Sequence, residues 1–320
     1  MPIVVNSNAS ATTASFNLSR ANDALRKSLG RLSSGNRINN PADDAGGLAV
    51  AYKLNSKANR TTAILQNSQN ALSYLQVQDS GLQNAGKIVD RMSELRVMSQ
   101  DITKNTQDIE NYSKEFVELQ SQLNQISKEK FNGISLFASS TVTAVGSLET
   151  STASFGSLSY NTASRTLITH DSGISTAGSV KLNVVNFQFM LSIGNLNSGA
   201  ATGAATDLGN IDGANAGTGI SSSGFISDIT EVNVSQFTNI IERIADMRAE
   251  NGAEQNRVLN SIDLLQTNLS NIEAAHGRIM DTDIALESTR FARHNILVQA
   301  SAAMTAQANQ LTNVALQLLG

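Results

Sequence analysis

Residues 105–127 read NTQDIENYSKEFVELQSQLNQIS, and this stretch decides the fold class. Its apolar residues follow one another after three or four positions: Ile109, Tyr112, Phe116, Leu119, Leu123 and Ile126. Side chains at this spacing lie on one side of an α-helix, and the repeat is typical of helices that pair as a coiled coil. We therefore expect a helix whose apolar seam packs against a partner helix.

A second and longer seam of this kind covers residues 237–279. Three polar residues interrupt its middle, namely Arg248, Asn251 and Gln255. A polar group on such a seam often fixes the register or the number of partners, at some cost in stability. We interpret these three residues as determinants of register in a helical bundle.

A third, less regular seam lies within residues 44–100, with the members Leu65, Leu72, Leu75, Leu82, Val89, Met92 and Leu95. Ahead of it, Asn40 can cap a helix, Pro41 suits a first helical turn, and Asp43 and Asp44 lie where the helix dipole favours carboxylates. One helix over this range would be roughly 85 Å long at ~1.5 Å per residue. The sequence therefore predicts a mainly α protein built as a long antiparallel coiled-coil helical bundle.

Residues 138–230 break the helical pattern, because they are rich in Gly, Ser and Thr. Two runs in this stretch alternate apolar and polar residues: Val180, Leu182 and Val184, then Phe187, Phe189, Leu191 and Ile193. Alternation with a period of two indicates strands. We predict a small β-rich lobe inserted into the bundle, with residues 194–224 as a loose surface lobe.

Both ends of the chain carry an apolar stripe with a seven-residue repeat. The stripe near the N-terminus holds Leu18, Leu25 and Leu32, and the stripe near the C-terminus holds Leu297, Met304, Leu311 and Leu318. No charged side chain follows Arg293, and a helix with so little charge needs neighbours on several sides. We expect these leucines and Met304 to form polymer interfaces, in termini that are disordered in the monomer and ordered among copies.

The composition argues against several kinds of site. The chain has no cysteine for a disulfide or a thiolate metal site, and its 3 histidines are isolated. A net charge of -4 argues against general nucleic-acid binding. No stretch reaches the roughly 18 apolar residues of a membrane span, so we expect no membrane insertion.

Two motifs superficially suggest ligand binding. Residues 81–88 resemble a phosphate-binding loop, but Ile88 stands where that loop needs Ser or Thr, so we interpret them as a helix with two packing glycines. Asp281, Asp283 and Glu287 lack the central glycine and the final glutamate of a calcium loop, so we interpret them as a solvated face. We therefore predict no catalytic, metal or cofactor site, and a protein that is not an enzyme.

Five segments, in order along the chain, closely resemble the signatures of bacterial flagellins. They are residues 31–50 (RLSSGNRINNPADDAGGLAV), 131–133 (FNG), 248–257 (RAENGAEQNR), 278–283 (RIMDTD) and 306–309 (AQAN). The resemblance covers about residues 1–137 and 231–320. It leaves out the middle of the chain, which is where that family varies.

The resemblance implies a structural subunit that polymerises into the flagellar filament for swimming motility, after unfolded export by the flagellar type III apparatus. It implies an inner-tube helix pair from residues 1–40 and 284–320, an outer-tube bundle from 41–137 and 231–283, and a variable surface lobe from 138–230. The partners implied are many copies of the chain, the export chaperone and export gate, the filament cap and the hook-filament junction protein. The place implied is the filament outside the cell.

The segment of flagellins that an innate immune receptor senses aligns with residues 90–100. Arg91, Glu94 and Leu95 match the family pattern. Four positions depart from it: Asp90, Ser93, Arg96 and Met98. The resemblance therefore implies a receptor segment here, and the departures bear on whether the receptor recognises it.

Three other interpretations stay open. A hook-filament junction protein shares the terminal signatures, usually in less complete form, and self-polymerisation would separate the two. A filament-displayed adhesin would need binding chemistry in residues 138–230, where the notable residues Arg165, His170, Asp171 and Lys181 form no recognised set. A cytoplasmic coiled-coil adaptor would explain the heptads but neither the signatures nor the uncharged C-terminal end.

Overall fold

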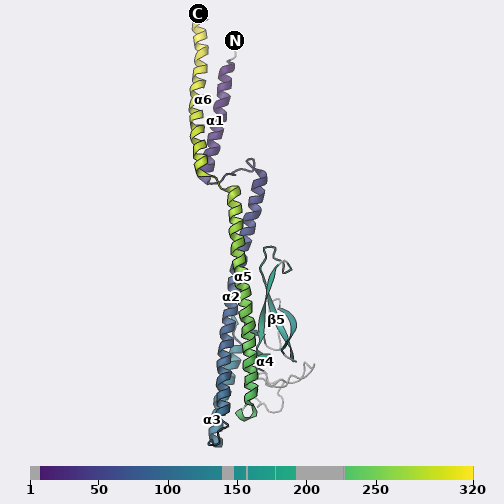
Figure 1. Ribbon diagram of the computed structural model, residues 1–320. Helices are drawn as coiled ribbons and strands as arrows, with labels where there is room; N and C mark the ends of the chain where they lie inside the picture. Colours follow the sequence, from purple (N-terminus) through teal and green to yellow (C-terminus); the bar gives the residue numbers. More distant parts are fainter. Residues whose placement is uncertain are drawn as a thin grey trace. The chain divides into compact units, whose positions relative to one another are not determined.

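The computed structural model describes residues 8–138, 148–155, 158–176, 178–191, 226 and 228–319. Its long helices are α1 (Ala9–Ser34), α2 (Ala45–Met98), α3 (Thr106–Ser127), α5 (Val234–Met280) and α6 (Ile284–Leu319). The strands β1 to β6 and the short turns α4 (Phe187–Met190) and η2 (Ile229–Glu231) lie between α3 and α5 in the sequence (Figure 1). This confirms the mainly α class with a small β-rich insertion.

The chain divides into two compact units, and the division falls inside α2 and α5. Unit 1 comprises Met1–Asn59 and Asn268–Gly320, and unit 2 comprises Arg60–Thr267. The helices expected over residues 44–100, 105–127 and 237–279 correspond to α2, α3 and α5.

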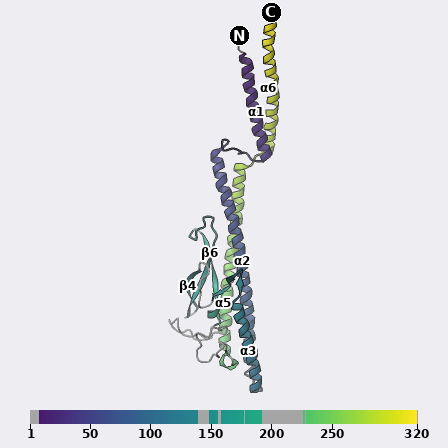
Figure 2. The same ribbon diagram turned by 180° about the vertical axis from the view of Figure 1, so that it is seen from behind.

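In unit 1, α1 and α6 lie side by side and run in opposite directions, and α6 continues past the start of α1, where Asn8 Nδ2 donates to the Ala308 carbonyl at 2.8 Å (Figures 1 and 2). α1 ends at Gly35, whose φ of 73° favours glycine. The Gly35 N–H donates to the Arg31 carbonyl at 2.9 Å, which satisfies one of the last carbonyls of the helix.

The chain segments that flank α1 and α6 at their other end are joined by a β-bridge between Asn36 and Asp281. On either side of this bridge, Arg37 N–H donates to the Met280 carbonyl at 2.6 Å and Thr282 N–H donates to the Gly35 carbonyl at 2.9 Å. These backbone bonds fix where the pairing of α1 with α6 begins.

The cap of α2 is Asp44, because Gly47 N–H donates to Asp44 Oδ1 at 2.8 Å. The predicted cap at Asn40 is wrong. Residues 41–43 form a turn, closed by a bond from Asp43 N–H to the Asn40 carbonyl at 2.9 Å. Pro41 therefore starts this turn, and the helix begins only after it.

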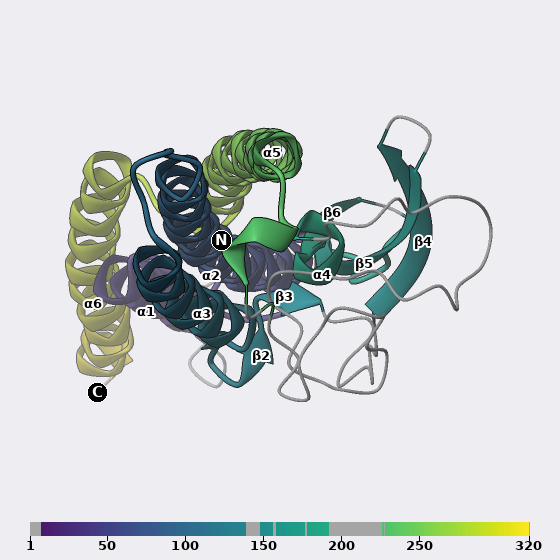
Figure 3. The ribbon, with the colours of Figure 1, turned by 90° about the horizontal axis from the view of Figure 1, so that it is seen from below.

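In unit 2, α2 and α5 lie side by side with α3 beside them around one apolar core (Figure 3). Its buried members from the predicted seams are Leu75, Leu82, Val89, Met92 and Leu95 of α2, Phe116 and Leu123 of α3, and Phe237, Ile244, Val258 and Ile262 of α5. The rings of Phe116 and Phe237 meet edge to face with centroids 6.1 Å apart, as aromatic pairs prefer. These positions confirm most of the heptad assignments, but in α5 the buried Ile240 and Met247 take the places that the predicted seam gave to Ile241 and Arg248.

Two sheets belong to unit 2. β1 (Lys130–Phe131) and β2 (Ile134–Ser135) form a hairpin, and β3 (Phe137–Ala138), β4 (Leu148–Phe155), β5 (Leu158–Ile168) and β6 (Ser179–Asn186) form a second sheet in the order β3-β6-β5-β4. β3 pairs with β6 in parallel, and the other pairs are antiparallel. Val180, Leu182 and Val184 are buried, which confirms the first predicted strand.

The second predicted strand is wrong, because α4 follows β6 directly. Phe187 and Leu191 are both buried and are four residues apart, and Leu191 N–H donates to the Phe187 carbonyl at 3.1 Å. A short apolar run satisfies the helical spacing as well as the strand spacing, so periodicity alone does not decide between them. The Phe189 side chain, Ile193 and the predicted surface lobe at 194–224 lie outside the described residues.

Candidate assembly surface

The two terminal helices of unit 1 meet along a seam that mixes small and large residues. On α1 the face turned from solvent follows Ala11, Ala14, Leu18, Ala21, Leu25, Ser28 and Leu32, and Asn22, Ala24 and Arg31 beside it are also partly buried. On α6 they are Glu287, Phe291, His294, Val298, Ser301, Thr305 and Ala308. Both sets have steps of three and four residues, so each forms one helical face. Alanine and serine allow the two helices to approach closely.

The structure places the predicted interface residues on two different surfaces. Leu18, Leu25 and Leu32 are partly buried on the seam with α6. Leu297 and Met304 lie on α6 beside that seam, three or four residues from its members His294, Ser301 and Ala308, and they are 42% and 63% exposed. Leu311 and Leu318 lie in α6, but their side chains are outside the described part of the structure.

Further large apolar side chains are exposed on both helices. They are Phe16 at 64% and Leu29 at 54% on α1, and Ile284 at 64%, Leu286 at 51% and Ile296 at 66% on α6. Single exposed apolar residues are normal on a protein surface, but contiguous apolar patches mark contact with other chains or ligands. The paired helices therefore leave many of their large apolar side chains exposed.

A groove of about 480 Å³ lies on the same helix pair. Its lining comes from α1 and α6: Ala11, Thr12, Ser15, Phe16, Ser19, Thr305 and Asn309. At one edge of the groove, the Arg20 guanidinium lies over the Phe16 ring, 5.3 Å from its centre, as in a cation–π contact. No charged residue lines the groove.

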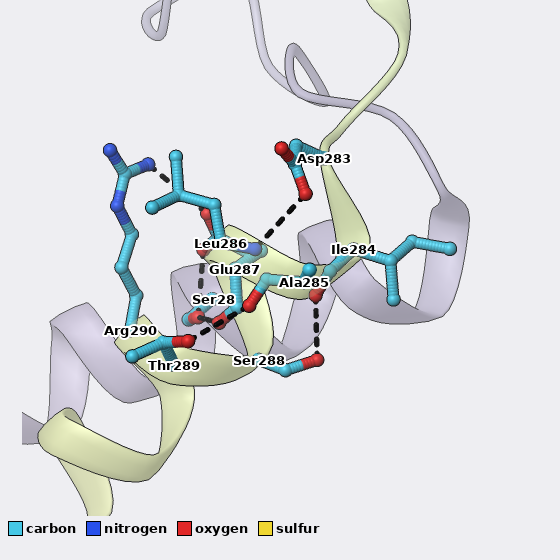
Figure 4. A network of polar contacts seen from close by, with 9 residues as sticks. All are labelled: Ser28, Asp283, Ile284, Ala285, Leu286, Glu287, Ser288, Thr289 and Arg290. Carbon is cyan, nitrogen blue, oxygen red and sulfur yellow. Dashed lines mark hydrogen bonds and ion pairs between the residues drawn. The ribbon is translucent and has the colours of Figure 1, made fainter.

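One buried polar contact ties α1 to α6 near the start of α6 (Figure 4). Ser28 Oγ donates to Glu287 Oε1 at 2.7 Å, and Arg290 Nη1 lies 3.3 Å from Glu287 Oε2. Glu287 is only 3% exposed, so its assignment to a solvated face is wrong. The sequence signal that could have found it is the seam itself, since Glu287 stands four residues before Phe291 on the α1-facing side.

The start of α6 is capped by Asp283, because Leu286 N–H donates to Asp283 Oδ1 at 3.0 Å (Figure 4). On the other helix, Lys27 forms an ion pair with Asp43, and this ammonium lowers the pKa of the Asp43 carboxyl. Arg37 Nε donates to the Ile279 carbonyl at 3.1 Å. Asp283, Lys27, Asp43 and Arg37 thus form contacts at the ends of helices and in the segments that connect them.

The three predicted register residues of α5 are brought together with α2 in unit 2. Arg248 Nε donates to Asp79 Oδ1 at 2.9 Å. Asn251 Nδ2 donates to Gln78 Oε1 at 2.7 Å, and Gln255 Nε2 donates to Asn251 Oδ1 at 2.6 Å. The polar interruption of the seam therefore makes two separate contacts with α2: the Arg248–Asp79 ion pair, and the Asn251–Gln78 hydrogen bond, to which Gln255 is joined through Asn251.

Gln78 also connects the helices to the strands, which sequence reasoning did not reveal. Its side chain is fully buried. Gln78 Nε2 donates to the Leu136 carbonyl at 2.9 Å and to the Asn183 carbonyl at 3.3 Å. One buried amide thus contacts α5, the segment before β3, and β6.

Asn183 of β6 donates hydrogen bonds to two carboxylates of α5. The Asn183 N–H donates to Glu254 Oε1 and Oε2 at 2.9 and 3.1 Å, and its Nδ2 donates to Glu250 Oε1. Burial raises the pKa of Glu254 from its ordinary 4.5 to about 7, and the charge of Glu250 adds to this, while the Asn183 N–H and Arg257 oppose it.

The predicted receptor segment lies on α2. Arg91 Nε lies 2.8 Å from Glu115 Oε1 of α3, and Arg91 Nη1 lies 3.2 Å from Glu94 Oε2. The side chains of Arg91 and Glu94 are 42% and 61% exposed, whereas Leu95 is completely buried in the core. Only the first two of the matching residues are therefore at the surface of the chain.

Residues 81–88 lie inside α2, and both glycines pack against neighbours. A Cβ on Gly81 would lie 2.8 Å from Phe137 Cζ, and one on Gly86 would lie 3.7 Å from Ile244 Cγ2. This confirms the packing interpretation of these glycines. Among the described residues there is no group of His, Cys, Asp or Glu side chains able to hold a metal ion. The described helices include none that is long and apolar enough to cross a membrane.

Long paired helices with an inserted sheet, and with apolar side chains left at the surface, are typical of structural proteins that assemble with other chains. Two family models match it: the bacterial flagellin N-terminal helical region over residues 5–141 and the bacterial flagellin C-terminal helical region over residues 234–319. The chain belongs to the bacterial flagellin family.

Full-length relatives agree with this assignment. The chain is 30% identical over 384 residues to flagellin A of Vibrio cholerae, with 100% of both chains covered. It is 30% identical over 320 residues to the flagellin of Bacillus subtilis, covering 98% of this chain and 99% of that one. The flagellar filament 33 kDa core protein of Treponema phagedenis is 29% identical over 318 residues, with 99% and 100% covered.

The protein is accordingly a structural, non-enzymatic subunit of the extracellular flagellar filament, and it serves motility. These relatives are named as flagellins and a filament core protein, which supports the filament subunit over the junction-protein interpretation. The resemblance drawn from the five sequence signatures is confirmed.

Proposed function

We propose that the α1 and α6 pair is the element through which this flagellin polymerises, with Leu297 and Met304 at the contact between copies. The observation that carries the proposal is the exposure of these side chains, 42% and 63%, on a helix without a charged residue after Arg293. Water around such a surface costs free energy, and burial against neighbouring copies removes that cost. Leu311 and Leu318 continue the same repeat.

The proposal gives a different role to Leu18, Leu25 and Leu32. These leucines stabilise the pairing of α1 with α6, and the pairing holds α6 so that its stripe stays exposed. In a single chain only one helix covers these leucines, so further copies around the pair complete their burial. The pairing and the polymer then stabilise each other.

The contact joins unlike surfaces, since an apolar stripe on one copy meets a different surface of the next. Contacts of this kind do not close on themselves unless the rotation is right, and they generate helical filaments. We propose residues 1–40 with 284–320 as the inner-tube part, 41–137 with 231–283 as the outer-tube bundle, and 138–230 as the outer lobe. Arg248, Asn251 and Gln255 set the register of the bundle.

The further partners follow from family membership rather than from contacts. We propose that the chain is exported unfolded by the flagellar type III apparatus, with a chaperone covering the apolar C-terminal helix and the filament cap guiding assembly onto the junction protein. An innate receptor that reads residues 90–100 would contact Arg91 and Glu94, because Leu95 is buried.

Polymerisation of purified protein, followed by electron microscopy, tests the proposal. The full chain is expected to form filaments, and a chain limited to residues 41–283 is expected to form none. Circular dichroism of the shortened chain shows whether its helices remain. Filaments of normal yield from the shortened chain would contradict a role for the terminal helices.

A further inference from the structure

The groove on the terminal helix pair has a length that the exposed stripe of α6 matches. Along α1 its lining extends from Ala11 to Ser19, which is eight residues, or roughly 12 Å at ~1.5 Å per residue. On α6, Leu297 and Met304 are seven residues apart, which is about 10.5 Å by the same rise. Two side chains separated by two helical turns therefore fit one groove.

The two surfaces share the absence of charge. The groove is lined by Ala11, the exposed Phe16, the hydroxyls of Thr12, Ser15, Ser19 and Thr305 and the amide of Asn309. The stripe lies on the part of α6 that has no charge after Arg293, with the exposed small residues Ala300 and Ala303 between its two large members. A helix of this kind can approach another helix closely, since neither surface carries a charge that would have to lose its water.

The stripe cannot enter the groove of its own chain. Thr305 and Asn309 of α6 line the groove, so α6 already forms one of its walls. Leu297 and Met304 remain 42% and 63% exposed in the single chain. A copy of α6 that fills the groove therefore belongs to another chain, and it carries an uncharged stripe of matching length.

We propose that the groove lined by Ala11, Thr12, Ser15, Phe16 and Ser19 receives Leu297 and Met304 from α6 of a second copy. This rests on the proposed function and specifies one of its contacts. This groove and this stripe involve different residues of the copy, so each copy can receive one neighbour in its groove and place its stripe in another. The contact is then open and repeats along a filament.

Cysteine cross-linking tests the assignment, because the chain has no cysteine of its own. One preparation carries Thr12→Cys or Ser19→Cys, and a second carries Leu297→Cys or Met304→Cys. One variant from each preparation is combined in the same sample, both as minor components in an excess of wild-type protein. The mixture is polymerised and oxidised, and disulfide-linked dimers are measured. Wild-type protein in excess keeps the polymer intact even where a variant alone assembles poorly.

Two patterns support the proposal. Dimers from Thr12→Cys with Leu297→Cys and from Ser19→Cys with Met304→Cys indicate parallel entry of the second helix. Dimers from the two exchanged combinations indicate antiparallel entry. Ala306→Cys is the matched control, since this exposed position lies two residues from Met304 and thus on the opposite side of α6.

The outcomes separate this proposal from the one on which it rests. Filaments that incorporate the variants but give no more dimer than the Ala306→Cys control overturn the groove contact and leave polymerisation intact. Failure of wild-type protein to polymerise overturns both. A several-fold excess of dimer in one of the two patterns, found only in polymerised samples, is the expected result.

Discussion

Asn251 donates a hydrogen bond to Gln78 across 2.7 Å, and the two side chains are 2% and 0% exposed. This contact joins the two longest helices of unit 2 at a point where an apolar pair would allow sliding by a heptad. Because a buried amide without a partner is costly, we expect this pair to favour the observed register of the two helices.

Asn251→Ala should destabilise the protein by about 1–3 kcal/mol, the usual cost of leaving a buried polar group unpaired. The variant removes the donor to Gln78 and the acceptor of Gln255. Urea unfolding followed by circular dichroism measures the loss. Asn256→Ala, at an exposed position of the same helix, serves as control, and an equal effect of both substitutions would speak against a specific role for Asn251.

Gly81→Ala should be more harmful than Gly86→Ala. The new methyl group at position 81 would lie 2.8 Å from the Phe137 ring, which is 3% exposed and has little room to move. Overpacking of this kind costs about 1–3 kcal/mol. At position 86 the contact with Ile244 is an ordinary 3.7 Å, and alanine favours the helix by up to about 1 kcal/mol. Thermal unfolding of both variants decides whether their effects have opposite signs.

Glu254 should make stability depend on pH between about 4.5 and 7. Its pKa is raised to about 7 in the folded chain, so the folded state holds the proton more tightly than the unfolded state. The resulting stabilisation is fully present below pH 4.5, the ordinary pKa, and is lost as the pH rises through about 7.

Glu254→Gln keeps this side chain neutral at every pH. The melting temperature of the variant minus that of the wild type should therefore increase as the pH is raised from 5 to 8. Glu242→Gln, at an exposed position of α5, is the matched control. A constant difference between Glu254→Gln and wild type over this range would refute the assignment.

Glu287→Ala should weaken the terminal helix pair, because it leaves the buried Ser28 hydroxyl without its acceptor. Glu287→Gln retains a carbonyl oxygen for this bond and should retain more of the stability. The temperature at which filaments depolymerise reports the difference, with Glu273→Ala at an exposed site of α5 as control. If the Gln and Ala variants of Glu287 behave alike, the hydrogen bond contributes little.

The terminal helices should be ordered by polymerisation. In dilute monomer we expect fast amide exchange over residues 297–318, since a single partner helix covers little of their apolar surface and backbone ordering costs about 1–2 kcal/mol per residue. In the filament the same amides should be strongly protected. Strong protection in the monomer would show that the α1 and α6 pair is stable alone.

The helices of unit 2 could be predicted because their large residues and their helical period agree. Phe116 and Leu123 mark the buried side of α3 without ambiguity. On α5, Arg248, Asn251 and Gln255 mark where the helix makes polar instead of apolar contacts with α2. The α1-facing side of α6 could not be found in this way. Its seam runs through Val298 and Ser301, while the larger Leu297 and Met304 form the more conspicuous repeat.

The strands were harder to predict than the helices. β4 and β5 contain many Ser and Thr residues, and their pairing joins positions that local periodicity does not connect. Gln78 is a similar case, since a polar residue inside a helix becomes a contact to β6 only through the tertiary fold. Phe187 and Leu191 fit the helical spacing as well as the strand spacing, and in the folded chain they are buried as part of a helical turn.

The antiparallel course of α1 and α6 has a practical consequence for imaging. A fluorescent protein or epitope tag fused to either terminus would emerge at the same end of the helix pair, next to the surfaces proposed to meet other copies. The turn between β5 and β6 offers a better insertion point, because Gly173 there has a φ of 72° and is exposed to solvent. A reporter placed there would be attached to unit 2 and not to either terminal helix.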